Sequence, residues 1–271
     1  MESYLSSLFG LSGKKVLITG GTRGIGRGLV TALASAGADI ILLARDPDST
    51  AVRGMTSIIE SCGRKYYIYP CDLSDRARLL SIVPEITRDG HEIDIFVHCG
   101  GLQHRSPAED FPDVNWDEII GVNLTARFQL SRELGKLWLN TSLRSPENPA
   151  SVQGKKKIVF IASATTYSAS TEIPAYVSSK GALGQLTKAF NNEWMAKGSN
   201  VNAIAPGYIS TELTTALRDG SEKEKNLMAR IPAARWGLPS DLAGAIIHLC
   251  GKSSDYVGGE IHAVDGGFLG R

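Results

Sequence analysis

The sequence predicts an α/β protein built on a doubly wound parallel sheet, with helices on both faces. Short apolar runs alternate with longer helical stretches along all 271 residues, which is the pattern of repeated strand–helix–strand units. The runs are continuously apolar, as expected of strands that are buried on both faces. No linker or internal repeat divides the chain, so we expect a single domain over residues 1–271.

The expected elements follow one another in strict alternation. The strands are Lys15–Thr19, Asp39–Ala44, Lys65–Pro70, Ile93–His98, Lys157–Ala162 and Val201–Ile204. The helices are Gly24–Ala36, Thr50–Cys62, Arg76–Arg88, Trp116–Leu139, Ala175–Lys197 and Ser240–Cys250. Right-handed crossovers bring the carboxyl ends of the strands, and any ligand, to one edge of the sheet. We expect a surface loop at Asn140–Lys157 and a lid over the strand ends at Pro206–Arg235.

Composition and charge argue against several classes of function. Lys and Arg number 29 and Asp and Glu number 28, so a strongly basic surface for nucleic acid is not expected. No apolar run reaches the roughly 18–20 residues that span a bilayer, and the N-terminus does not resemble a secretory signal. The four cysteines lack metal-ligand spacing, which predicts no metal site and a reduced, cytoplasmic compartment.

A glycine-rich loop follows the first strand and opens the first helix, with the sequence Thr19-Gly20-Gly21-Thr22-Arg23-Gly24-Ile25-Gly26. Glycines here let the backbone approach a pyrophosphate, and the helix N-terminus offers free N–H groups and a positive dipole end. The spacing is not the common G-x-G-x-x-G, because Leu29 stands where the third glycine would be. The loop indicates a Rossmann-type nucleotide site rather than a turn used only for packing. The expected contacts are Gly20, Thr22, Arg23, Gly24, Ile25 and Gly26.

Charged residues after the next two strands bear on the choice of cofactor. Arg45 follows the second strand, where an acidic residue selects NAD and an arginine accommodates the 2′-phosphate of NADP. With Arg23 nearby, Arg45 favours NADP(H). If the strand were one residue longer, Asp46 would stand at this position and favour NAD(H). A third interpretation is that Arg45 is only a solvated charge of the loop. Asp72 is expected either to bond the adenine amino group or to cap the next helix, a role for which Ser74 competes.

Polar residues at and after the fifth strand predict the chemistry. Ser163 closes that strand, and Tyr176 and Lys180 are four residues apart, so a helix places the phenol and the ammonium on one face. The pKa of a tyrosine is ordinarily about 10, and we expect the ammonium to lower it so that Tyr176 exchanges protons near neutral pH. Ser163 is expected to bond the reacting oxygen, and Asn123 to hold a water that relays protons toward Lys180.

Taken in this order, the motifs resemble those of the short-chain dehydrogenase/reductase family, from Lys14 to Gly267. The resemblance implies a catalytic tetrad of Asn123, Ser163, Tyr176 and Lys180, the last two of which also contact the cofactor. The other cofactor contacts that it implies are Leu73, Gly100, Pro206, Gly207, Ile209 and Thr211. The implied substrate contacts are Arg105, Ser163, Tyr176 and Tyr208. Members of this family usually form homotetramers or homodimers through the helices that carry the tetrad.

One stretch departs from the family pattern. The usual Asn-Asn-Ala-Gly after the fourth strand is replaced by His98-Cys99-Gly100-Gly101. In the family the asparagine pair supports the central strand and the catalytic helix. We expect His98 to replace some of those bonds rather than to take a new catalytic role, and Cys99 to be a small packed thiol.

Within the family the chain most resembles the sugar-acid dehydrogenases, such as 2-deoxy-D-gluconate 3-dehydrogenase and gluconate 5-dehydrogenase. Stretches that carry this likeness include Gln103-His104-Arg105 and Ile231-Pro232-Ala233-Ala234-Arg235-Trp236-Gly237. A guanidinium at Arg105 suits a substrate carboxylate, which it would bind through two bonds; a surface cation is the other interpretation.

Three functions follow from these observations. The first is an NAD(P)(H)-dependent oxidoreductase that interconverts a ketone and a secondary alcohol of a sugar acid, a hexonate or a keto-deoxy acid. The second is an NADPH-dependent ketoreductase of a polyketide or other biosynthetic pathway. The third is a nucleotide-binding regulator without turnover, and the complete tetrad counts against it.

Overall fold

The computed structural model describes residues 3–140 and 155–271 of the chain. Its sheet has seven strands, all parallel, in the order β3-β2-β1-β4-β5-β6-β7. The strands are β1 (Lys15–Thr19), β2 (Asp39–Ala44), β3 (Tyr66–Pro70), β4 (Ile95–His98), β5 (Lys156–Ile161), β6 (Ser199–Pro206) and β7 (Ile261–Val264). The doubly wound parallel sheet predicted from the sequence is therefore confirmed. The strand β7 was not predicted; it is short, pairs only with β6 at the edge, and exposes His262 and Ala263.

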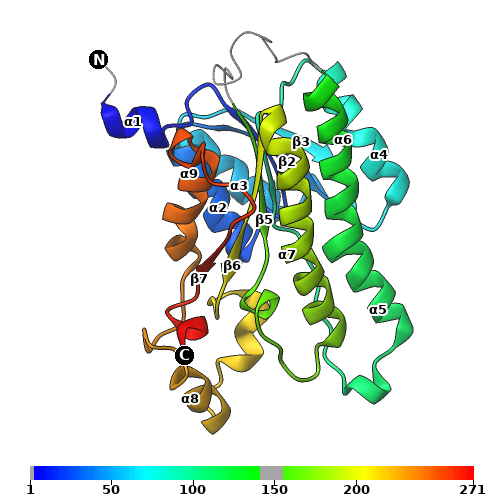
Figure 1. Cartoon of the computed structure of the whole chain (residues 1–271), viewed down its shortest axis with the longest axis vertical. Helices are drawn as coiled ribbons and strands as arrows, with labels where there is room; N and C mark the ends of the chain where they lie inside the picture. The colour runs from blue at the N-terminus through cyan, green and yellow to red at the C-terminus, as the bar shows by residue number, and fades with distance from the viewer. Residues whose placement is uncertain (1–2, 141–154) are drawn as a thin grey trace.

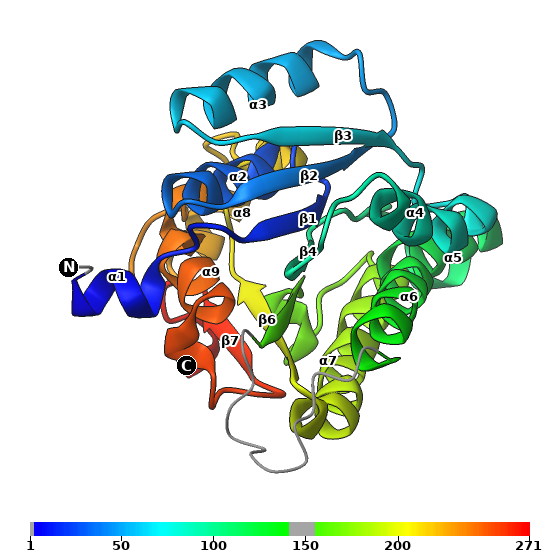
Figure 2. The same cartoon turned by 90° about the horizontal axis from the view of Figure 1, so that it is seen from above.

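Helices cover both faces of the sheet (Figures 1 and 2). One face carries α2 (Gly24–Ser35), α3 (Thr50–Ser61) and α9 (Ala243–Cys250). The other carries α4 (Arg76–Arg88), α6 (Ala126–Asn140) and α7 (Pro174–Trp194). Successive side chains of a strand point to opposite faces of the sheet, so each strand contributes to both cores. Leu17 packs on the α4 side, whereas Val16 and Ile18 pack on the α2 side. Of the remaining helices, α5 (Asp113–Ile120) packs against α7, α1 (Tyr4–Phe9) lies on the outer side of α9, and α8 (Glu222–Met228) lies beyond the carboxyl end of β6.

The helix predicted over Trp116–Leu139 is interrupted in the middle. The segment α5 ends at Ile120, a π-helical turn covers Gly121–Thr125, and α6 continues from Ala126. A π-helical turn contains about one residue more than an α-helical turn, and this shifts the backbone. Such turns are common at functional sites. Asn123 lies inside this turn and is fully buried.

The order of the strands places the site. The chain leaves β1 for β2 on one side and later returns to β4 on its other side, so β1 and β4 flank the point where the topology reverses. Ligands of open parallel sheets bind at the carboxyl ends of strands at this point. Beyond β6, the predicted lid region is tied back by a bridge between Ile209 and Gly237 and contains α8. The loop predicted at Asn140–Lys157 falls mostly on 141–154, outside the described residues.

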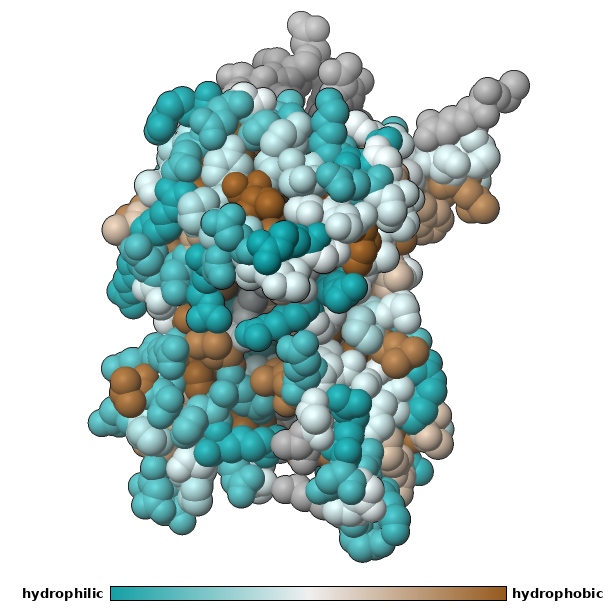
Figure 3. All heavy atoms as spheres, turned by 180° about the vertical axis from the view of Figure 1, so that it is seen from behind, coloured by the Kyte–Doolittle hydropathy of each residue, from teal (hydrophilic) through white to brown (hydrophobic). Residues whose placement is uncertain are grey.

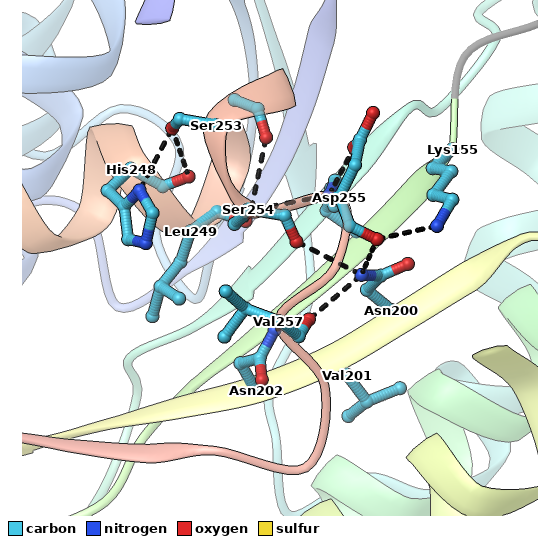
Figure 4. A network of polar contacts seen from close by, with 12 residues as sticks. Lys155, Asn200, Val201, Asn202, His248, Leu249, Ser253, Ser254, Asp255 and Val257 are labelled. Carbon is cyan, nitrogen blue, oxygen red and sulfur yellow. Dashed lines mark hydrogen bonds and ion pairs between the residues drawn. The ribbon is translucent and has the colours of Figure 1, made fainter. Parts of the chain in front are cut away.

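A polar network fastens the opposite end of the sheet (Figure 4). The amide of Asn200 donates to the main-chain oxygens of Ser254, Asp255 and Val257 at 3.2, 3.2 and 2.8 Å. Asn202 donates to the same oxygen of Val257 at 3.0 Å. These bonds tie the start of β6 to the segment after α9. They hold the sheet at the end away from the glycine loop.

A membrane-spanning segment needs a long helix with an apolar surface. Figure 3 views the face opposite to that of Figure 1 and shows a largely hydrophilic surface with scattered apolar side chains. Within 3–140 and 155–271, no helix combines the length and apolar character needed to cross a bilayer.

Candidate functional site

The glycine loop after β1 is packed too tightly to accept side chains. A Cβ on Gly20 would lie 2.6 Å from the backbone of Gly100, and Gly20 has a φ of +65°. A Cβ on Gly26 would lie 1.9 Å from the carbonyl oxygen of Gly20. Arg23 precedes α2 in extended conformation, and its side chain makes no capping bond to the helix. The first N–H groups of α2 are thus free of a side-chain cap, which suits a pyrophosphate.

Loops from the ends of other strands converge on this turn. A Cβ on Gly24 would lie 3.4 Å from the Thr211 methyl group beyond β6. A Cβ on Gly100, after β4, would lie 2.6 Å from a methyl group of Leu73, which follows β3. Since Gly100 also approaches Gly20, four of the predicted cofactor segments are side by side: the glycine loop, Leu73, Gly100 and Thr211.

The charged residues after β2 and β3 are also close together. Arg45 and Asp72 are exposed, and hydrogen bonds from Ser74 and then the charge of Arg45 lower the pKa of the Asp72 carboxyl. Asp72 accepts from the main-chain N–H and the hydroxyl of Ser74, both at 2.8 Å. The helix α4 begins at Arg76, so the residue at its N-cap is Asp75, whose carboxylate accepts from two N–H groups of the first turn. The predictions that Asp72 or Ser74 caps this helix were wrong.

Ser163, Tyr176 and Lys180 meet beyond the end of β5. The hydroxyl of Ser163 accepts from the main-chain N–H of Thr165 at 3.1 Å. The Lys180 ammonium lies 5.4 Å from the centre of the Tyr176 ring, and it donates to the carbonyl of Ile161 at 2.7 Å. The spatial cluster that the spacing of these residues predicts is present in the structure.

The expected lowering of the Tyr176 pKa by Lys180 was wrong for this structure. Burial raises the pKa of Tyr176, and the groups that lower it are the Ser163 hydrogen bond and the charge of Arg127. Burial also lowers the pKa of Lys180 well below its ordinary value, and Arg127 lowers it further. Sequence spacing gives the separation of two groups but not the loss of hydration that each suffers.

Asn123 clamps the loop after β4 against α7. Its side-chain oxygen accepts from the N–H of Leu102 at 2.8 Å, and its amide donates to the carbonyl of Leu102 at 2.9 Å. The same amide donates to the hydroxyl of Ser179 on α7 at 3.3 Å. The relay water proposed at Asn123 stays a prediction.

Comparison with known proteins agrees with this arrangement. A family model described as enoyl-(acyl carrier protein) reductase matches residues 20–269. A 2-dehydro-3-deoxy-D-gluconate 5-dehydrogenase of Pseudoalteromonas atlantica is 44% identical over 265 residues, which cover 97% of this chain and 98% of that protein. This chain is a short-chain dehydrogenase/reductase. As a member of that family it is an NAD(P)-dependent oxidoreductase that acts on CH–OH groups.

Other short-chain dehydrogenase/reductases are similar over the same length. A Bacillus subtilis protein of the same name as the Pseudoalteromonas relative is 40% identical over 268 residues, 99% of both chains. A solved gluconate 5-dehydrogenase from Burkholderia cenocepacia, in complex with NADP and tartrate, superposes with a TM-score of 0.89 at 31% identity. It covers 99% of this chain and 100% of that one.

His98 of this short-chain dehydrogenase/reductase is linked through Thr19 to the loop after β4. Its ring nitrogen Nδ1 lies 2.9 Å from the hydroxyl of Thr19, which in turn accepts from the N–H of Gly100 at 3.2 Å. Burial and the nearby charge of Arg127 lower the pKa of His98 well below its usual range, so the ring is neutral. His98 thus makes one bond to β1, and its Nε2 has no partner among the described groups; that it replaces bonds of the family's asparagine pair stays a prediction. The neighbouring Cys99 thiol is a poor nucleophile, because burial raises its pKa to about 11.

Sequence reasoning missed Arg127. This residue lies on α6 in the stripe that also buries Ser131, Leu134 and Trp138, and its side chain is fully buried. The only signal in the sequence is one charged residue at a core position of an amphipathic helix. Which groups it meets depends on contacts between distant elements, and no local pattern predicts those.

The two predicted substrate residues outside the catalytic cluster, Arg105 and Tyr208, lie on separate segments. Arg105, in the loop after β4, is 40% exposed, and its guanidinium lies 3.5 Å from the carboxylate of Glu172. Tyr208 lies beyond β6, where its ring meets those of Trp236 and Phe268 at 6.0 and 5.4 Å. Over the described ranges 3–140 and 155–271, no cluster of three His, Cys, Asp or Glu side chains is arranged to hold a metal ion.

Proposed function

We propose that this short-chain dehydrogenase/reductase interconverts a ketone and a secondary alcohol of a sugar acid, with NADP(H) as cofactor. The observation that carries the chemistry is the meeting of Ser163, Tyr176 and Lys180 beyond the end of β5. Relatives named for sugar-acid substrates, similar over nearly the whole chain, support the substrate class.

The side chains divide the acid–base work. Bound NADP(H) supplies or accepts a hydride at the substrate carbon. The Tyr176 phenol donates a proton to the substrate oxygen during reduction and removes it during oxidation. The Ser163 hydroxyl donates to the same oxygen and stabilises its negative charge. Lys180, which donates to Ile161, orients the cofactor ribose beside Tyr176.

Charge near the adenosine end supports NADP(H). Arg45 is exposed after β2 and Arg23 is exposed at the start of α2. Two guanidinium groups there would bind a 2′-phosphate. Asp46 would take the position beside the ribose only if the register of β2 were one residue longer. The remaining contacts of the cofactor are the loop residues Gly20, Thr22, Gly24, Ile25 and Gly26, with Asp72, Leu73, Gly100, Pro206, Gly207, Ile209 and Thr211 from the other strand ends.

Arg105 is the substrate-binding cation in this proposal. Its only ion pair in the described parts of the chain is the weak one with Glu172, so a substrate carboxylate could displace that partner and gain two charge-assisted bonds. The aromatic group of Tyr208, Trp236 and Phe268 instead favours the second candidate, reduction of an apolar ketone in a biosynthetic pathway.

Other features of the proposal concern the whole molecule. We expect residues 1–271 to act as one domain and residues 206–235 to close over the substrate. A hollow on the outer surface of α6 and α7 is lined mostly by apolar side chains, including Leu124, Phe128 and Leu186, and suits a second copy of the chain in a dimer or tetramer. All four cysteines are free thiols, which fits a cytoplasmic enzyme.

A substrate panel tests the proposal. Dissociation constants for NADPH and NADH are measured first, and turnover is then followed on hexonates, keto-deoxy sugar acids and hydrophobic ketones. We expect tighter NADPH binding and turnover of the sugar acids, with a KM at least tenfold higher in Arg105→Gln. Preferred turnover of hydrophobic ketones, unaffected by Arg105→Gln, would establish the second candidate. Cofactor binding with no turnover on any substrate would indicate a regulator.

A further inference from the structure

A buried cation lies close to the reaction centre, and no carboxylate of the described residues neutralises it. Arg127 is fully buried, and no described Asp or Glu forms an ion pair with its guanidinium. Its Nε also has no hydrogen-bond partner among the described groups. Burying a charge without an oppositely charged partner is strongly destabilising. A residue this costly needs a compensating role.

The guanidinium joins two pieces of main chain that flank the site. Its Nη2 donates to the carbonyl of Gly100 at 2.7 Å. Its Nη1 donates to the carbonyl of Asn123, and lies 3.4 Å from that of Val122. Gly100 is the residue that approaches Gly20 of the cofactor loop, and Asn123 lies in the π-helical turn. One planar group therefore spans the loop after β4 and the turn between α5 and α6.

The same group brings a positive charge to the site. Burial lowers the pKa of Arg127 only to about 10, so it stays charged at neutral pH. The titratable and polar groups that face Tyr176 are Ser163 beyond β5, Cys99 after β4, Arg127 on α6 and Lys180 on α7. Burial raises the pKa of Tyr176, and the Ser163 hydrogen bond and then the charge of Arg127 lower it.

We propose that Arg127 is a positioning residue of the reaction centre: its guanidinium bridges the Gly100 and Asn123 carbonyls and keeps a positive charge near Tyr176. The inference rests on the proposed acid–base role of Tyr176. In this chain Arg127 and His98 together take over the support that the family obtains from an asparagine pair after the fourth strand. A lysine cannot do both tasks, because it lacks the planar fork that reaches two carbonyls.

Substitutions at Arg127 separate the bridge from the charge. Arg127→Met and Arg127→Gln remove the charge, Arg127→Lys keeps it, and Arg88→Met removes an exposed arginine from the last turn of α4 as a control. Two readouts are needed: the pH profile of kcat for alcohol oxidation, and an ultraviolet titration of tyrosine ionisation from which that of Tyr176→Phe is subtracted. The second readout requires no turnover.

The neutral variants are expected to raise the midpoint of both titrations by about one pH unit. Arg127→Lys is expected to keep the midpoint and to lose about tenfold or more in kcat/KM, because the two carbonyls are no longer bridged. The Arg88→Met control is expected to match the wild type in both. Should both neutral variants fail to fold, the Arg127→Lys enzyme still tests the bridge.

Unchanged midpoints in folded neutral variants would overturn the role of the charge, and wild-type kcat/KM in Arg127→Lys would overturn the bridge. A different result would overturn the proposed function: Tyr176→Phe would keep its turnover, independently of the results for the Arg127 variants. If Tyr176→Phe loses turnover and the Arg127 variants behave as wild type, only the present inference fails.

Discussion

Replacing Gly26 with alanine tests the geometry of the cofactor loop most severely. The new Cβ would lie 1.9 Å from the Gly20 carbonyl oxygen and 2.8 Å from its carbon, where ordinary contacts begin at 3.4 Å. The overlap of roughly 1.5 Å is with backbone, so no rotamer change relieves it. Alanine gains about 0.5–1 kcal/mol over glycine within a helix, whereas overpacking costs about 1–3 kcal/mol. We expect a net loss near the upper end, about 2 kcal/mol.

The consequence is measurable as stability and as cofactor affinity. A loss of about 2 kcal/mol lowers the melting temperature of a protein of this size by about 4–8 °C. Displacement of Gly20 and the start of α2 is expected to weaken NADPH binding by at least tenfold, measured by fluorescence titration. The matched control is Gly54→Ala in α3, where a Cβ meets nothing within 4 Å; it is expected to stabilise by about 0.5–1 kcal/mol. Wild-type stability and NADPH affinity in Gly26→Ala would refute the reasoning.

Three further substitutions each test one feature. Arg45→Ala is expected to weaken NADPH binding by about tenfold or more and to leave NADH binding nearly unchanged, since only the 2′-phosphate contact is lost; equal losses for both cofactors in paired titrations would contradict this. In the fold, the pKa of His98 lies well below its ordinary 6.5, so the unfolded state alone takes up a proton below that pH. Stability is then lost as pH falls, by up to about 1.4 kcal/mol per unit, and urea unfolding of His98→Asn is expected to lack that part of the slope. Phe128 is 39% exposed in the hollow on α6 and α7, and Phe128→Asp is expected to lower the oligomeric state seen by light scattering; an unchanged mass would place the interface elsewhere.

Patterning along the chain was enough to predict most of the sheet. Each of the six predicted strands has a counterpart, because strands buried on both faces leave continuous apolar runs such as Asp39–Ala44. The strand β7 escaped because an edge strand of four residues, half exposed, carries no such run. The helix α1 (Tyr4–Phe9) escaped for a similar reason, since it buries none of its residues.

The site was predictable only in part. The spacing of Tyr176 and Lys180 gives their shared helix face, and the structure places them near Ser163. The environment of these groups was not predictable, because hydration and charge in the site depend on Arg127, which comes from another helix. The π-helical turn at Gly121–Thr125 likewise has no sequence period of its own to reveal it.

The central claim is that the Tyr176 phenol exchanges the proton during carbonyl reduction. The most direct test compares Tyr176→Phe with the wild type in single-turnover reduction of a keto-deoxy sugar acid, with NADPH binding measured in parallel. The account predicts a fall of about 10²–10⁴-fold in the rate, with NADPH affinity changed by less than about threefold. A Tyr176→Phe enzyme that binds NADPH and reduces the substrate at the wild-type rate would contradict it.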